Sequence, residues 1–114
     1  MPNYTFVATA SAVLERRCTV VFVDISPETF TIDPETVEAA IGPETRAILP
    51  VHLGGHPADM GTLREIAQRH NLAIIEDSHR HTVQNTRQKK LDPSAMSVHL
   101  VSKPRKILPP AKVV

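Results

Sequence analysis

Three short apolar runs separated by helical patterns restrict the fold of this chain more than any other feature. Each run is rich in β-branched residues and too short for a helix, so each predicts a buried strand. Strands that alternate with helices through short connections are typical of a parallel sheet with covering helices. We therefore predict the α/β class, with strands at residues 19–23, 47–51 and 72–75 and helices at residues 5–17, 34–41 and 60–70.

Local signals indicate the helix boundaries and the inward faces. Asp33 can accept hydrogen bonds from the first turn of the second helix, and Gly42 followed by Pro43 ends that helix. Pro50 lacks a backbone donor, so we expect it at the end of its strand. At helical spacing, the expected inward residues are Phe6, Ala10, Val13 and Leu14 in the first helix and Leu63, Ile66 and Ala67 in the third.

The charge of the chain changes sign after residue 78. Residues 1–78 carry 5 Lys/Arg against 11 Asp/Glu, a net charge of −6, and residues 79–114 carry 8 Lys/Arg against one Asp, a net charge of +7. The second segment also has four prolines, no glycine and no sustained apolar period. We therefore divide the chain into a domain of residues 1–78 and a basic, poorly patterned tail of residues 79–114 that is irregular or disordered.

Length and composition exclude several classes of protein. At 114 residues the chain fits one small domain. Its longest apolar stretches are about a quarter of the roughly 20 residues that span a bilayer. The lone Cys18 cannot form an internal disulfide, and residues 1–4 lack the basic start of an export signal. We therefore expect a cytoplasmic protein with no membrane contact.

Four strings occur in the order and spacing of one enzyme family. They cover residues 4–13, 21–25, 48–60 and 74–77, and include Tyr-Thr-Phe-Val-Ala-Thr-Ala and Ile-Ile-Glu-Asp. In these strings the chain resembles the DegT/DnrJ/StrS-type sugar aminotransferases, which are pyridoxal-phosphate enzymes of fold type I. The resemblance implies part of their large domain, the cofactor pyridoxal 5'-phosphate, a nucleotide-linked keto-sugar and an amino donor as substrates, and a homodimer in the intact protein.

The resemblance also assigns roles to two residues. Asp77 matches the acid that bonds the pyridine nitrogen of the cofactor and keeps it protonated, so that the ring can accept electrons. Phe6 matches the aromatic residue whose ring lies on the cofactor face. From the residues alone, Asp77 can also be a solvated acid at a strand end, and Phe6 a core aromatic. For His52 and His56, in a matching loop, we expect hydrogen bonds to the backbone and no catalytic role.

The family pattern is lost after Asp77. The lysine nearest to the position of the family's covalent lysine is Lys106, one position out, and it is our candidate catalytic residue. A one-nucleotide offset in the back-translated codons permits the family string His-Gly-Ala-Glu-Tyr from residues 81–86, and equivalent strings at two later places. We therefore hypothesise that the loss of one nucleotide near codon 78 put residues 79–114 out of frame.

The chain is expected to be a fragment, because the family segment that binds the cofactor phosphate would precede Met1. We accordingly expect weak or absent aminotransfer by this chain alone. The alternative is a non-catalytic protein whose basic tail binds nucleic acid. No aromatic residue is interleaved there for base stacking, and His79 and His81 lack a third ligand, so we predict neither a nucleic-acid partner nor a metal site. The basic residues concerned are at positions 87, 89, 90, 103, 105 and 106.

Overall fold

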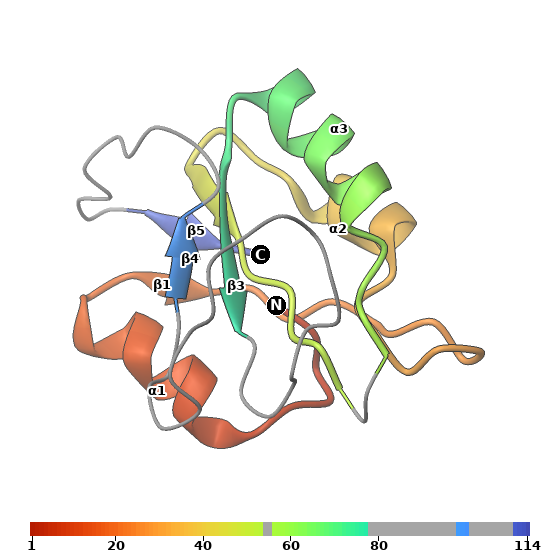
Figure 1. Cartoon of the computed structure of the whole chain (residues 1–114). Coiled ribbons are helices and arrows are strands. Elements are labelled where there is room, and N and C mark those ends of the chain that lie inside the picture. Colours follow the sequence, from red (N-terminus) through yellow and green to blue (C-terminus); the bar gives the residue numbers. More distant parts are fainter. Residues whose placement is uncertain (54–55, 78–97, 101–110) are drawn as a thin grey trace.

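The computed structural model describes residues 1–53, 56–77, 98–100 and 111–114 (Figure 1). In chain order, the elements within these ranges are α1 (Val7–Glu15), β1 (Thr19–Val20), α2 (Pro34–Ala40), β2 (Thr45–Ile48), α3 (Met60–His70), β3 (Ala73–Asp77), β4 (Val98–Leu100) and β5 (Lys112–Val113).

The strands form one sheet in the order β1-β5-β2-β3-β4. The pairs β1–β5, β5–β2 and β2–β3 are parallel, and β4 runs antiparallel to β3. Helix α3 connects the parallel neighbours β2 and β3, which is the crossover that parallel pairing requires. The prediction of an α/β fold with mostly parallel strands and covering helices is therefore confirmed.

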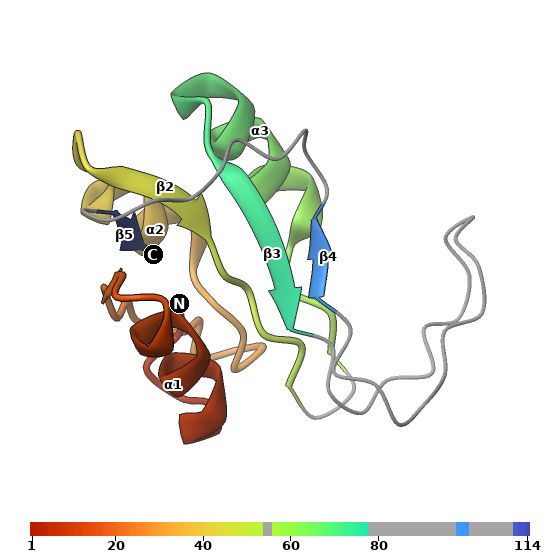
Figure 2. The same cartoon turned by 90° about the vertical axis from the view of Figure 1, so that its left-hand side faces the viewer.

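The helices cover both faces of the sheet, with α1 on one face and α2 and α3 on the other (Figure 2). Successive side chains of a strand point to opposite faces, and β3 follows this rule. Ala73 and Ile75 are partly buried and pack against the core cluster that contains Val13 of α1. Ile74 belongs to the cluster that contains Leu63 of α3. The odd-numbered residues of β3 therefore face α1, and the even-numbered residues face α3.

Helix α1 is shorter than predicted, and its inward face differs from the prediction. Thr9 and Val13, one turn apart, are buried, whereas Phe6 and Leu14 are 75% and 58% exposed. Phe6 has an extended backbone, with φ −76° and ψ 138°, and precedes the first helical residue, so its side chain does not share the helical face. Leu14 is turned about 100° from Val13 around the helix axis. The expected inward positions of Phe6 and Leu14 were therefore wrong.

The other elements follow the sequence pattern with shifted ends. Strand β1 is shorter than residues 19–23, β2 begins and ends earlier than residues 47–51, and β3 continues past residue 75 to Asp77. Pro50 lies beyond the end of β2, as expected from its missing donor. Helix α3 has the predicted bounds, and its three predicted inward residues, Leu63, Ile66 and Ala67, are buried.

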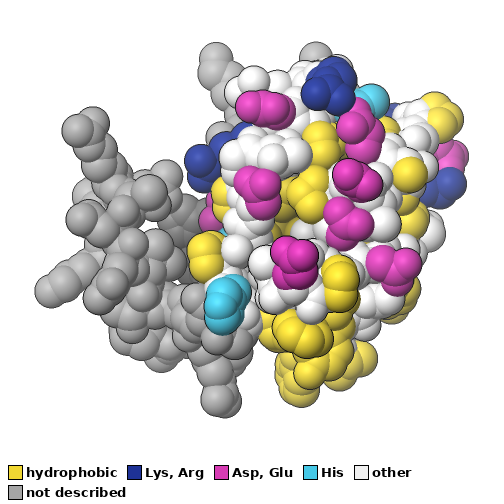
Figure 3. Space-filling model, turned by 90° about the vertical axis from the view of Figure 1, so that its right-hand side faces the viewer, with side chains coloured by type: hydrophobic (Ala, Val, Ile, Leu, Met, Phe, Trp, Pro, Cys, Tyr) yellow, Lys and Arg dark blue, Asp and Glu magenta, His cyan; other side chains and the backbone are white. Residues whose placement is uncertain are grey.

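Acidic caps begin α2 and α3. Asp33 Oδ1 accepts a hydrogen bond from the backbone N–H of Glu35 at 3.0 Å, which confirms the predicted start of α2. Asp59 caps α3 by accepting from both the backbone N–H and the hydroxyl of Thr62, at 3.1 and 2.7 Å. The side-chain and backbone hydrogen bonds from Thr62 lower the pKa of Asp59. The face that carries α2 and α3 is rich in acidic side chains (Figure 3).

Strand β5 lies between β1 and β2, in the interior of the sheet. The backbone N–H of Val21 donates to the carbonyl of Val113 at 2.9 Å, and that of Val23 donates to Met1 at 3.1 Å. The segment that follows β1 therefore pairs first with β5, at Val21, and then with the N-terminus, at Val23. The N and C marks lie close together in both cartoon views (Figures 1 and 2). The division at residue 78 stays a prediction, although residues 111–114 pack within the sheet of the first domain.

No helix in the described ranges is both long enough and apolar enough to cross a bilayer.

Candidate functional site

Asp77 ends β3 at the carboxyl edge of the parallel strands. Its backbone N–H donates to the carbonyl of Pro50 at 3.0 Å, and its carbonyl accepts from the N–H of His52 at 3.2 Å. Val51 forms a parallel bridge with Asp77 between these two bonds. The segment after β2 therefore fixes the backbone of Asp77 on both sides. Open α/β sheets bind ligands at this edge.

The carboxylate of Asp77 points toward α1, as Ala73 and Ile75 do on the same face of β3. The hydroxyl of Thr9 donates a hydrogen bond to Asp77 Oδ2 at 2.6 Å. Thr9 is 5% exposed, in the first turns of α1. The sequence analysis did not identify Thr9. Thr9 lies in the string that carries the family resemblance, but nothing in its sequence position distinguishes it from a threonine that bonds within its own helix.

Phe6 caps α1 with its backbone, and its carbonyl accepts from the N–H of Thr9 at 3.1 Å. Its side chain is exposed and is not part of either apolar core cluster. The alternative that Phe6 is a core aromatic was therefore wrong. Contact between its ring and a cofactor stays a prediction, as does the contact of Asp77 with the pyridine nitrogen.

Glu76 precedes Asp77 and belongs to the opposite face of the sheet. Its carboxylate lies 3.7 Å from the guanidinium of Arg64 on α3 and 3.6 Å from Nε2 of His52. His52 is buried, and its Nδ1 accepts from the backbone N–H of Ala58 at 3.1 Å. Nε2 therefore carries the proton in the neutral ring and faces Glu76. The expected backbone hydrogen bond of His52 is confirmed, and the prediction for the exposed His56 remains untested.

A concave region lies on the side of α2. It has a volume of about 350 Å³ and is lined by residues 3, 22–24, 36, 39 and 40. Two of its lining residues bond each other, because the Asn3 side-chain amide donates to Asp24 Oδ1 at 2.8 Å. None of its lining residues is Phe6, Thr9 or Asp77.

Several predicted positions lie outside the described residues, namely Lys106, His79, His81 and the basic residues at 87–106. Among the residues that the structure describes, no three His, Cys, Asp or Glu side chains are grouped to hold a metal ion.

A mostly parallel sheet covered by helices on both faces places this chain in the α/β class. Proteins of this class commonly bind ligands at the carboxyl edge of the strands, where Asp77 lies. The chain belongs to the DegT/DnrJ/EryC1/StrS aminotransferase family, whose model matches residues 1–92.

Two of the relatives are named as sugar aminotransferases. The dTDP-3-amino-3,4,6-trideoxy-alpha-D-glucose transaminase of Streptomyces venezuelae is 51% identical over 78 residues, which are 68% of this chain and 21% of that protein. The UDP-N-acetyl-3-dehydro-alpha-D-glucosamine 3-aminotransferase of Acidithiobacillus ferrooxidans is 49% identical over 77 residues, again 68% and 21%. The crystal structure of NtdA from Bacillus subtilis with bound cofactor PMP has a TM-score of 0.70 and 48% identity, over 72% of this chain and 19% of that one.

The chain spans about a fifth of the length of the curated relatives that it matches, between 18 and 20% for the first three. It is thus homologous to a part of these proteins. The described residues fit the ring of a pyridoxal cofactor in their chemistry. A carboxylate at the sheet edge can accept from a pyridine N–H, and Phe6, the residue that caps α1, carries an exposed aromatic ring.

Proposed function

We propose that this chain is part of the cofactor-binding domain of a pyridoxal-phosphate-dependent aminotransferase that acts on nucleotide-linked keto-sugars. The observation that supports this most directly is the placement of Asp77. Asp77 lies at the carboxyl edge of β3, where the segment after β2 bonds its backbone and the hydroxyl of Thr9 bonds its carboxylate. Asp77 would bond the pyridine nitrogen, and Phe6 would cover the ring. When bound, the cofactor supplies an electron sink for the amino group transfer.

The substrates of the complete protein would be a nucleotide-linked keto-sugar and an amino donor. The names of the two relatives quoted above support this, since each is a transaminase of a dTDP- or UDP-linked sugar. We further propose that the complete protein is a homodimer.

We propose that this chain alone transfers amino groups weakly or not at all. It matches only a fifth of its relatives, and its candidate catalytic lysine, Lys106, lies in the segment where the family strings are lost. The family strings up to Asp77, and the relatives' match over 75 to 80 residues, are both consistent with a reading frame that changes near codon 78. Sequencing the gene around that codon tests this proposal. A one-nucleotide shift should restore the family strings downstream, and their absence in every frame would refute it.

Titration of the purified full chain with pyridoxal 5'-phosphate tests the cofactor proposal. Binding should be visible as a change in the cofactor's absorption and fluorescence. Asp77→Asn keeps the size of the side chain and removes its charge, so it should weaken binding at least tenfold, about 1.4 kcal/mol, because a charge-assisted hydrogen bond is lost.

Glu65→Gln is the matched control. Glu65 is exposed on α3, on the opposite side of the sheet, and the substitution removes the same charge. Its affinity should equal that of the unchanged chain. Equal affinities for Asp77→Asn and Glu65→Gln would mean that the cofactor is not held by Asp77.

A further inference from the structure

Thr9 uses its hydroxyl in an unusual way for a residue inside a helix. Threonine and serine hydroxyls in helices commonly donate to the carbonyl three or four residues earlier. Ser11 in the same helix does so, donating to Val7 at 3.1 Å. The hydroxyl of Thr9 instead donates to Asp77, on another element and 68 residues further along the chain. The bond therefore has a tertiary role, since it joins α1 to the end of β3.

The geometry of this bond restricts the side chain of Asp77. The donor–acceptor distance of 2.6 Å lies in the short range typical of a hydroxyl bound to a carboxylate. Thr9 is β-branched and 5% exposed, so its own side chain has few rotamers available. The backbone of Asp77 is fixed by its bonds to Pro50 and His52. The backbone bonds leave the two side-chain torsions of Asp77, χ1 and χ2, and the bond from Thr9 to Oδ2 restricts both.

We propose that Thr9 is a positioning residue for Asp77: its hydroxyl holds the carboxylate in the orientation from which it meets the pyridine N–H of the cofactor. This inference rests on the proposed function. A carboxylate has about four acceptor positions, so a hydrogen bond from Thr9 is compatible with another from a pyridine nitrogen. Because the orientation exists before the cofactor arrives, binding does not have to order this side chain.

The test uses three variants of the full chain. Thr9→Val keeps the shape of the side chain and removes the hydroxyl, and Thr9→Ser restores a hydroxyl at the same position. Ser11→Ala removes the neighbouring hydroxyl that bonds only within the helix. Two measurements are made on each variant. The first is the carboxyl ¹³C resonance of Asp77 without cofactor, and the second is the affinity for pyridoxal 5'-phosphate.

The Asp77 resonance should move in Thr9→Val, return toward its original position in Thr9→Ser, and stay unchanged in Ser11→Ala. Affinity should fall about tenfold in Thr9→Val, as expected for one hydrogen bond to a charged group, and recover in Thr9→Ser. Rescue by serine separates positioning from packing, because serine lacks the methyl group that valine retains.

Each remaining outcome is decisive. The inference is wrong if the Asp77 resonance has the same chemical shift in Thr9→Val as in the original chain. It is also wrong if the original chain binds the cofactor and Thr9→Val binds it with the same affinity. If no variant binds the cofactor, the original chain included, the proposed cofactor site of this chain fails. The response of the Asp77 resonance to the Thr9 hydroxyl then still decides whether Thr9 orients the carboxylate.

Discussion

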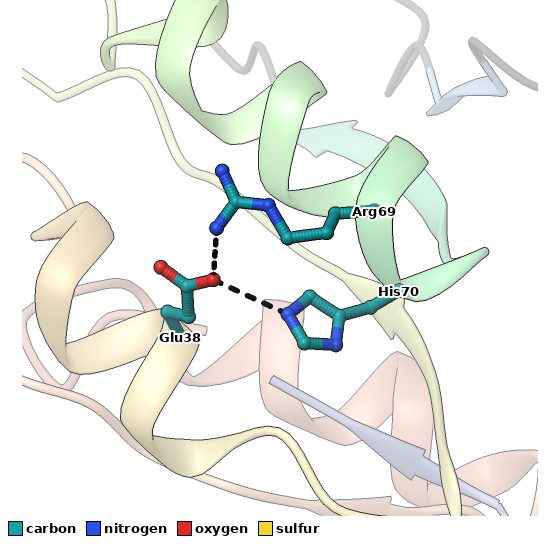
Figure 4. Close-up of polar contacts among 3 residues, drawn as sticks. All are labelled: Glu38, Arg69 and His70. Carbon is teal, nitrogen blue, oxygen red and sulfur yellow. Dashed lines mark hydrogen bonds and ion pairs between the residues drawn. The ribbon is translucent and has the colours of Figure 1, made fainter.

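Glu38 of α2 and His70 of α3 lie 3.3 Å apart, with the carboxylate Oε1 facing the ring Nε2 (Figure 4). Arg69 of α3 contacts the same oxygen. The hydrogen bond with His70, followed by the bond and the charge of Arg69, lowers the pKa of Glu38, because these groups stabilise the ionised carboxylate. The two helices on this face of the sheet are therefore joined by a carboxylate that both neighbours hold in its charged form.

Glu38→Gln should lower stability at neutral pH by a small amount, and the difference should disappear in acid. A carboxylate whose folded pKa is lowered stabilises the fold above its unfolded pKa, here 4.5, and this contribution is lost as the pH falls through the folded value. Urea unfolding of both chains from about pH 7 to about pH 3 measures this, with the exposed Glu65→Gln as control. A gap that stays constant over this range would show that the charge of Glu38 contributes nothing.

Leu63→Ala should destabilise the fold by about 2 to 5 kcal/mol, because it removes a buried side chain and leaves a cavity. Leu63 is 0% exposed and belongs to the core cluster between α3 and the sheet. Gln68→Ala, on the exposed side of the same helix, is the control and should change stability by no more than about 0.5 kcal/mol. Urea unfolding compares the two, and similar losses would contradict the observed inward face of α3.

Val113→Asp should destabilise the fold by about 3 kcal/mol or more, because it buries a charge in the middle of the sheet. Val113 is 2% exposed, and its backbone pairs with both β1 and β2. Its neighbour Lys112 forms an exposed ion pair with Glu44 at 3.2 Å, so Lys112→Ala should cost about 1 kcal/mol or less. Thermal unfolding measures both effects. Equally small changes in Tm for the two substitutions would contradict the interior position of β5.

The parts of the fold that the sequence predicts are those set by local chemistry. The apolar period of α3 lies within residues 60–70, so its bounds and inward residues were predicted correctly. The exposed position of Phe6 was not predicted. Thr9 and Val13 occupy the side of α1 that faces the strands, and which side faces them depends on how the helix packs. The position of β5 depends on pairing with β1 and β2, which are distant in the chain, and no local pattern indicates it.

The candidate site shows the same division. Asp77 was predicted because an acid follows an apolar strand in a family string. Thr9 was not predicted, because its bond to Asp77 depends on the packing of α1 against the end of β3. A threonine in a helix has a local acceptor available, so its sequence position gives no sign that the hydroxyl bonds elsewhere.

In a chain that carries a free amino group at Met1, this group should make the stability depend on pH. It donates to the carbonyl of Val21 at 3.0 Å, and burial lowers its pKa from 8.0 to about 5. Between these values the unfolded chain binds a proton that the folded chain does not, so stability should rise with pH from about 5 to about 8. The slope from this group is at most about 1.4 kcal/mol per pH unit. Acetylation of the amino group removes its titration, so the acetylated chain should have a flatter stability profile in urea unfolding. Identical profiles for the two forms would mean that the amine is solvated in the folded chain.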